Sequence, residues 1–162
     1  MHPDTYTVTL PYPDVHPAKA DLRLARLLFP LYSGPSGALC TLCEYLYAAL
    51  CIEETHGELS RVLDAIADTE RQHFRLLGRL LRDLGADPML RVRVESGRRT
   101  SAAPGTQSLR TQLTQYLQRE QTTADHYRYL LEQTDDEAVQ ALLRRILLDE
   151  EAHIRFFSQM TK

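Results

Sequence analysis

The chain has 162 residues, of which 43% are hydrophobic and 25% charged, as in a soluble globular domain with a sizeable core. Its formal net charge of −3 argues against bulk electrostatic binding to nucleic acid, so no nucleic-acid partner is expected. We find neither an uninterrupted apolar membrane span nor a signal-peptide pattern, and therefore expect a cytoplasmic protein without a membrane partner.

The beginning of the chain is rich in proline. Residues 1–17 hold four of the eight prolines, which favours an extended N-terminal arm. A single domain is expected over residues 18–162. It opens with leucines at helical spacing between residues 18 and 32, which predict a short amphipathic helix closed by Pro30 and the Ser33-Gly34-Pro35 turn.

Four long helices are predicted in the rest of the chain. Short turns after the first and third, and a long aperiodic connection over residues 86–106, indicate an all-α four-helix bundle with one long crossover. The second and third helices then run parallel. The predicted helices cover 37–56, 58–84 with Gly85 as C-terminal cap, 108–133 with Ser108 as N-terminal cap, and a stretch from Thr134-Asp135 to about Met160.

One short pattern occurs twice in these helices. Glu70 precedes His73 by three residues, and Glu150 precedes His153 by three, so each pair shares one helix face. Apolar neighbours indicate that both pairs point into the interior, where an unpaired Glu and His are costly. One pair alone would be explained best as a buried acid–imidazole ion pair, whereas two pairs in one small chain favour a bound cation.

The two halves of the chain match as an internal repeat except at one position. Glu120 lies seven residues before Tyr127 and shares its helix face, and Tyr45 is the counterpart of Tyr127 in the first half. Seven residues before Tyr45 stands Ala38, which has no carboxylate. The predicted pocket therefore contains two Glu-x-x-His pairs and Glu120, with its fourth corner vacant.

These features resemble the ferritin-like superfamily of carboxylate-bridged di-metal proteins, in particular its bacterial branch near the manganese catalases and the rubrerythrin-like and bacterioferritin-related proteins. The resemblance covers most of the chain after Tyr32 and implies a ferritin-like four-helix bundle. The matching stretches are Tyr32-Ser33-Gly34-Pro35, Tyr45-Leu46-Tyr47, Glu70-Arg71-Gln72-His73, Leu84-Gly85-Ala86-Asp87-Pro88, Glu120 and Ile146-Leu147-Leu148-Asp149-Glu150-Glu151-Ala152-His153.

Carried over to this sequence, the resemblance implies that Glu70 and Glu150 bridge two metal ions. His73 would bind one ion and His153 the other, with Glu120 as a terminal ligand beside His153. Because position 38 supplies no matching ligand, we expect one firmly held ion and one weak ion. Oxygen and imidazole donors without thiolate suit iron or manganese, with zinc possible in purified protein.

Two classes of function are compatible with this pocket. The first is a di-metal oxidoreductase, catalase-like or ferroxidase-like, that acts on peroxide, dioxygen or ferrous iron. Tyr45 and Tyr127 are its candidate catalytic residues, although core tyrosines that hydrogen-bond buried carboxylates are the simpler explanation. The alternative is a degenerate, non-catalytic bundle with a structural or assembly role, which Ala38 favours.

The remaining expectations concern partners and surfaces. A small inorganic substrate and further copies of the chain, as a homodimer or larger homo-oligomer, are the expected partners, and the arm and the segment around Tyr32 look like surfaces that pack on something. Arg144-Arg145 and Glu151 read as a solvated face. Cys40, Cys43 and Cys51 suit a reducing compartment rather than a disulfide framework.

Overall fold

The computed structural model describes residues 6–90 and 108–162, and over these ranges it contains five helices and no strand. The prediction of an all-α protein is therefore confirmed. The helices are α1 (Leu22–Ser33), α2 (Ala38–Ile52), α3 (Gly57–Asp83), α4 (Leu109–Leu131) and α5 (Glu137–Met160).

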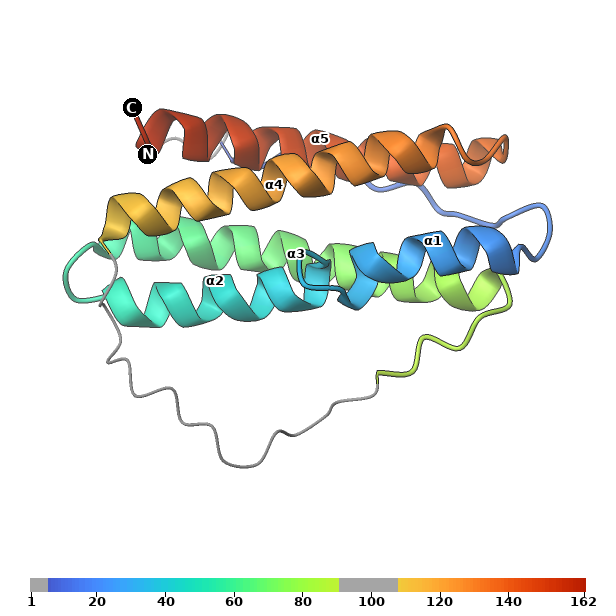
Figure 1. Cartoon of the computed structure of the whole chain (residues 1–162), viewed down its shortest axis with the longest axis horizontal. Coiled ribbons are helices and arrows are strands. Elements are labelled where there is room, and N and C mark those ends of the chain that lie inside the picture. The colour runs from blue at the N-terminus through green and yellow to red at the C-terminus, as the bar shows by residue number, and fades with distance from the viewer. Residues whose placement is uncertain (1–5, 91–107) are drawn as a thin grey trace.

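The helices form a four-helix bundle in which α1 and α2 share one position. Figure 1 shows α1 and α2 end to end along α3, with α4 and α5 completing the bundle. α3 and α4 run in the same direction, so the connection between them spans the bundle from one end to the other (Figure 1). This is the predicted layout with one long crossover; residues 91–106 of that predicted connection lie outside the described residues.

The short first helix ends at the predicted Ser33-Gly34-Pro35 turn, but Pro30 does not help to close it. Pro30 lies inside α1, which continues to Ser33, and its carbonyl accepts a hydrogen bond from the Gly34 N–H at 2.9 Å. A Cβ on Gly34 or Gly37 would come within 2.5 Å of the same oxygen, so the tight turn requires glycine at both positions. Since only residues 34–37 separate them, α1 and α2 together replace one long helix.

The segment that contains α1 and α2 passes a length and composition test for a membrane span, which was not expected from the sequence. Residues Leu22–Ile52, taken together, are long and apolar enough to cross a membrane by length and composition, although a core helix of a soluble protein passes the same test. The 12 residues of α1 and the 15 residues of α2 are separate helices. At 1.5 Å per residue they are about 18 and 22 Å long, shorter than a hydrocarbon core of about 30 Å.

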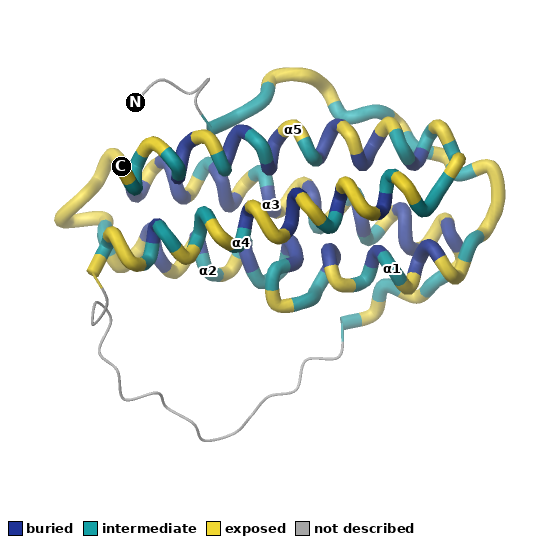
Figure 2. The backbone as a smooth tube through the Cα atoms, turned by 45° about the horizontal axis from the view of Figure 1, so that its top comes forward, coloured by how far each residue is buried: buried dark blue, intermediate teal, exposed yellow. Residues whose placement is uncertain are grey.

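A layer of polar side chains divides the apolar core into two clusters. One cluster lies around α1 and includes Leu28 and Leu77, and the other lies around α2 and includes Tyr45 and Ile66. Figure 2 shows the buried residues on the inward faces of the helices. Between the clusters, α3, α4 and α5 contribute buried glutamates and histidines, so the polar layer lies in the middle of the bundle.

The helix ends carry the predicted caps. The Ser108 side chain accepts a hydrogen bond from the Thr111 N–H at 3.2 Å at the start of α4. Gly85, just beyond the end of α3, has φ of 88°, the left-handed conformation that glycine adopts most readily. These local signals fix where the long helices begin and end.

Residues 6–20 contain no helix or strand and lie against the bundle. Tyr12 packs on the cluster around α1, and the Tyr6 ring meets Phe156 edge-on with centroids 5.7 Å apart. Tyr32 is 5% exposed, and its ring stacks on Phe74 with centroids 4.5 Å apart. The two segments that were expected to pack on something therefore pack on their own chain.

Candidate metal centre

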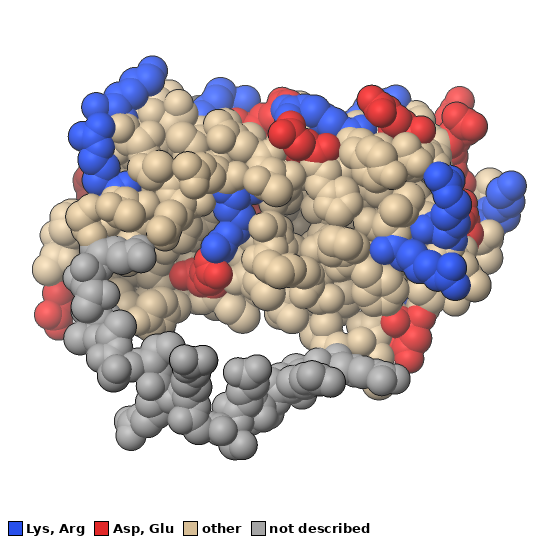
Figure 3. Space-filling view, in the orientation of Figure 1, with Lys and Arg blue, Asp and Glu red and all other residues tan. Residues whose placement is uncertain are grey.

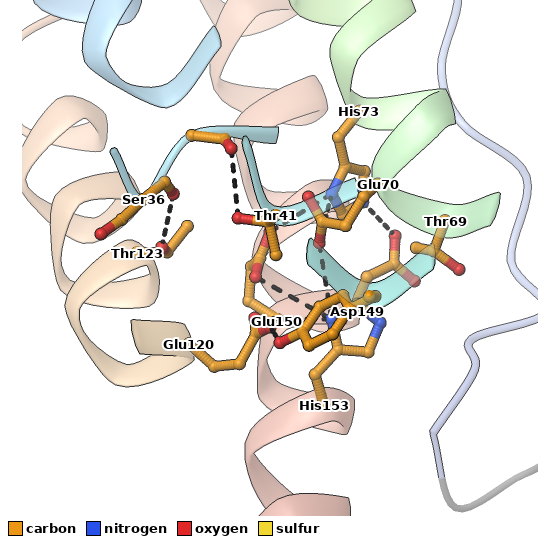
Figure 4. A network of polar contacts seen from close by, with 12 residues as sticks. Ser36, Thr41, Thr69, Glu70, His73, Glu120, Thr123, Asp149, Glu150 and His153 are labelled. Carbon is orange, nitrogen blue, oxygen red and sulfur yellow. Dashed lines mark hydrogen bonds and ion pairs between the residues drawn. The ribbon is translucent and has the colours of Figure 1, made fainter. Parts of the chain in front are cut away.

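The polar layer brings the predicted ligands into one buried pocket. Glu70 and His73 come from α3, Glu120 from α4, and Glu150 and His153 from α5, and none is more than 3% exposed. Figure 4 shows their side chains pointing toward one another. One ligand atom from each of four residues lies within 4.8 Å of the others, and these residues are Glu70, Glu120, Glu150 and His153. Opposite donors of a first-row ion lie about 4 Å apart, since each bond is about 2.0–2.2 Å long, so small side-chain rotations would close this group.

His73 lies at the edge of this four-residue group. Its Nδ1 is 3.5 Å from Glu70 Oε1 and 3.2 Å from Glu150 Oε1. His153 Nδ1 is 3.7 Å from Glu70 Oε1, 4.0 Å from Glu150 Oε2 and 3.5 Å from Glu120 Oε2. Both imidazoles therefore direct Nδ1 at the same two carboxylates, and neither ring is exposed to solvent.

Several buried atoms that face the pocket have no hydrogen-bond partner among the described residues. They are Glu70 Oε1, both carboxylate oxygens of Glu150, and Nδ1 of His73 and of His153. Buried polar atoms are nearly always hydrogen-bonded, and each unsatisfied one costs about 1–3 kcal/mol. Carboxylate oxygens and imidazole nitrogens are ligands of first-row divalent ions. The residues present therefore fit a metal ion, which would satisfy these atoms together.

The carboxylates repel one another when no metal balances their charge. Burial and the charges of Glu70 and Glu120 raise the pKa of Glu150 well above its ordinary value. Burial alone would lower the pKa of His73, but the charge of Glu70 and contacts with neighbouring carboxylates raise it well above 6.5. Burial would likewise raise the pKa of Glu120, but the contacts with His153 lower it to about 2. Protons and metal ions therefore compete for the same atoms.

The outward-facing ring nitrogens of the two histidines have different surroundings. His73 Nε2 is 3.0 Å from Asp149 Oδ2, whereas His153 Nε2 is buried without a hydrogen-bond partner among the described residues. In the internal repeat, Thr69 precedes Glu70 as Asp149 precedes Glu150, so a threonine stands where the other half has the carboxylate. Each half of the pocket therefore lacks one carboxylate that the other half has. The His153 half has no counterpart of Asp149, and the His73 half has no counterpart of Glu120.

Asp149, Tyr12 and Arg145 belong to the surroundings of the pocket but were not predicted. Arg145 was expected on a solvated face, and this expectation is wrong: the side chain is 7% exposed and its Nη1 is 2.7 Å from Asp149 Oδ2. The N-terminal arm covers this side of α5, which the periodicity of α5 alone does not indicate. One indication of Asp149 was present in the sequence, because this carboxylate directly precedes the predicted ligand Glu150. Nothing in the sequence indicated that Tyr12 reaches the pocket.

The two tyrosines and Ala38 also lie beside the polar layer. Tyr45 donates a hydrogen bond from its hydroxyl to Glu120 Oε1. The Tyr127 hydroxyl makes no hydrogen bond within the part of the chain that the structure describes, although this side chain is only 1% exposed. Ala38 is 3% exposed and belongs to the same apolar cluster as Tyr127. By the repeat, a carboxylate at position 38 would be the acceptor for Tyr127, as Glu120 is for Tyr45.

A bundle with one long crossover and a carboxylate–imidazole layer in its core has the architecture of the ferritin-like proteins. The model of the ferritin-like domain family matches residues 45–162, and the chain belongs to this family. The manganese catalase KatB from Anabaena PCC7120 superposes with a TM-score of 0.74 at 18% identity, covering 96% of this chain and 78% of that one. A bacterioferritin from Desulfovibrio desulfuricans gives a TM-score of 0.71 at 19% identity, covering 86% and 78%. No curated protein matches the chain.

Proposed function

We propose that this chain binds iron or manganese in the polar layer and supports redox chemistry on peroxide, dioxygen or ferrous iron. The observation that carries the proposal is the buried group of three carboxylates and one imidazole, whose ligand atoms lie within 4.8 Å of one another. Charges of one sign at such separations in a dry core are unfavourable unless a cation balances them.

The two ion positions are unequal. Glu70, Glu120, Glu150 and His153 would hold the first ion, because their donors already form one group. His73 would hold the second ion together with the carboxylates of Glu70 and Glu150, which both positions would share. Since Ala38 supplies no carboxylate, the second ion has fewer charged ligands and should bind more weakly.

The residues around the pocket have defined parts in this chemistry. A bound iron or manganese ion supplies Lewis acidity and a change of oxidation state. The apolar clusters on both sides exclude bulk water, which strengthens every electrostatic interaction inside. Tyr45 fixes the carboxylate of Glu120. Burial and the nearby charge of Glu150 raise the pKa of Tyr127 well above 10, so its hydroxyl keeps a proton that it can donate to an anionic oxygen in the pocket.

The choice of iron or manganese rests on donor chemistry and on the similar structures. The ligand atoms are carboxylate oxygens and imidazole nitrogens, without a thiolate. The bacterioferritin structure is described by its diiron site, and KatB is a manganese catalase. Zinc also fits these donors, and its presence in purified protein would fill the site without redox activity.

A non-catalytic bundle is the second candidate function. Ala38 favours it, because the fourth corner of the pocket is filled by a buried methyl group instead of a carboxylate. In that case the metal would stabilise the fold by binding the native state alone. The two candidates differ in turnover and in the number of ions per chain.

Metal analysis and activity assays on one pair of variants test the proposal. Glu150→Gln removes a buried carboxylate of the pocket, and Glu151→Gln changes the neighbouring residue, which pairs with Arg128 at 2.8 Å on the surface. Protein purified without added metal, and then loaded with Mn²⁺ or anaerobic Fe²⁺, is assayed for metal content, peroxide consumption and ferrous-iron oxidation.

Wild type and Glu151→Gln should bind one to two ions per chain and turn over, and Glu150→Gln should lose both properties. Bound metal without turnover supports the structural candidate. A wild-type protein that binds no metal refutes the proposal, as does a Glu150→Gln variant that binds metal like wild type.

Self-association and a cytoplasmic location are further proposals. α2 contains one charged residue, Glu44, which pairs with Arg119, while Leu46, Tyr47 and Leu50 are 44–73% exposed. Figure 3 shows few charged side chains over α2 and the adjoining part of α4. A second copy of the chain would cover these apolar side chains, whose exposure to water is unfavourable. The three cysteines are free thiols, as a reducing compartment would keep them.

A further inference from the structure

The N-terminal arm reaches the metal centre through Tyr12, whose ring meets the His73 ring edge-on with centroids 6.1 Å apart and whose hydroxyl donates a hydrogen bond to the carboxylate of Asp149. Oδ2 of Asp149 lies 3.0 Å from His73 Nε2 and accepts a hydrogen bond from the Tyr12 hydroxyl at 2.7 Å. The Asp149 side chain is only 2% exposed. Tyr12, which lies ten residues before the first residue of α1, is therefore linked to the His73 ring by two successive hydrogen bonds through Asp149.

Arg145 ties the arm to the same carboxylate. Its Nη1 is 2.7 Å from Asp149 Oδ2, its Nε donates to the Leu10 carbonyl at 2.8 Å, and its Nη2 donates to the Val8 carbonyl at 2.9 Å. The guanidinium also lies 4.3 Å from the centre of the Tyr12 ring. A planar guanidinium can make all these contacts at once, which a lysine cannot. Tyr12 and Arg145 thus connect Asp149 to the docked arm.

We propose that Tyr12 and Arg145 are positioning residues of the metal centre, and that the docked arm sets the affinity of the ion at His73. This inference rests on the proposed metal-binding function. An imidazole that donates from Nε2 to Asp149 presents a lone pair at Nδ1, the atom that faces Glu70 and Glu150. Partners of this kind fix the ring of a metal-binding histidine and raise its basicity.

The effect should be confined to the second ion. His153 has no outer partner among the described residues, so the first ion does not depend on such an arrangement. The ion at His73 lacks a carboxylate at position 38 and shares its other ligands. His73 is therefore the one ligand that this ion does not share, and the affinity for the ion should depend strongly on how the His73 ring is oriented.

Docking of the arm and binding of the second ion must also affect each other equally. If the docked arm raises the affinity for the ion by a given factor, the ion stabilises the docked arm by the same factor. The docked arm borders an open cavity of about 370 Å³, whose lining includes Thr7, Leu10, Tyr12, Arg145 and Asp149.

Co²⁺ titration of the full chain tests this inference. Tyr12→Phe removes one hydroxyl and keeps the ring over Arg145, and Tyr6→Phe is the matched control, because the Tyr6 ring contacts Phe156 but its hydroxyl makes no hydrogen bond within the described residues. Calorimetry and the visible absorption of bound Co²⁺ report each ion. Hydrogen exchange of peptides from residues 6–17, with and without Co²⁺, reports docking of the arm.

Tyr12→Phe should weaken the second Co²⁺ by up to about 10-fold and leave the first unchanged, because it loosens Asp149, whereas loss of a direct partner of a metal-binding histidine typically costs about 10–100-fold. In wild type, the second Co²⁺ should slow exchange in the arm by a similar factor. An unchanged second affinity in Tyr12→Phe overturns the inference, as does equal weakening of both ions or of Tyr6→Phe. Uptake of only one Co²⁺ by wild type removes the inference but keeps the proposed function, whereas no uptake removes both.

Discussion

Replacing Glu120 by glutamine is the most direct test of which donors hold the first ion. Glutamine has nearly the same shape and keeps an oxygen that accepts the hydrogen bond from Tyr45, but it removes one of three negative charges from the four-residue group. The change is therefore electrostatic rather than steric. We expect at least a 100-fold loss of affinity for the first ion, about 2.8 kcal/mol.

This loss is measurable as a change in thermal stability. At a free metal concentration 100 times the wild-type Kd, binding stabilises the native state by about 2.7 kcal/mol, and with 100-fold weaker binding only by about 0.4 kcal/mol. For a chain of this size, 1 kcal/mol shifts Tm by about 2–4 °C. The metal-induced rise in Tm should therefore be about 5–9 °C smaller in Glu120→Gln than in wild type.

Each protein is its own reference in this assay, because the rise is measured between a chelator and a fixed Mn²⁺ concentration. Any effect of the substitution on the metal-free fold then cancels. Glu54→Gln, an exposed residue in the turn after α2, is the matched control and should show the wild-type rise. If Glu120→Gln shows the same rise as wild type and Glu54→Gln, Glu120 is not a ligand of the first ion.

Three further predictions concern the second ion, protons and assembly. Ala38→Glu should raise metal content toward two ions per chain, measured by elemental analysis, and Ala38→Gln should not; equal content in both would show that position 38 does not face the pocket. Metal uptake should release protons, since the raised pKa values of Glu150 and His73 leave protons in the metal-free pocket, and apparent affinity should fall as pH falls. A binding constant that does not change between about pH 8 and pH 6 would contradict this competition. Leu50→Lys, at a side chain 73% exposed, should shift the chain toward monomer in sedimentation velocity with unchanged stability; an unchanged distribution would place any interface elsewhere.

The fold was predictable because its determinants are local. The 3.6-residue periodicity, the serine before α4 and the glycine after α3 fix the long helices, and the unequal connections fix their order. The turn at Ser33-Gly34-Pro35 between α1 and α2 was predicted correctly, but Pro30 was wrongly expected to help close α1, because a proline usually ends a helix. Here the ring is accommodated, and Gly34 and Gly37 turn the chain instead. That depends on how closely two backbone segments approach, which composition does not reveal.

The candidate ligands were predictable for a related reason. Residues three apart on one helix must share a face, so the Glu-x-x-His pairs could be read from spacing alone, and the repeat pointed to Glu120. Asp149 adjoins a predicted ligand but faces another helix, where it meets His73. Arg145 has the composition of a surface residue and is buried because the arm lies over it.

Periodicity and pairing within single helices thus determined the bundle, the buried pairs and the vacancy at position 38. Only the tertiary structure decided which residues support each histidine, because those partners come from segments as far apart as Tyr12 and Asp149. A helix face is fixed by the geometry of a few neighbouring residues. A contact across 137 positions depends on how the whole chain closes, and a local pattern carries no record of it.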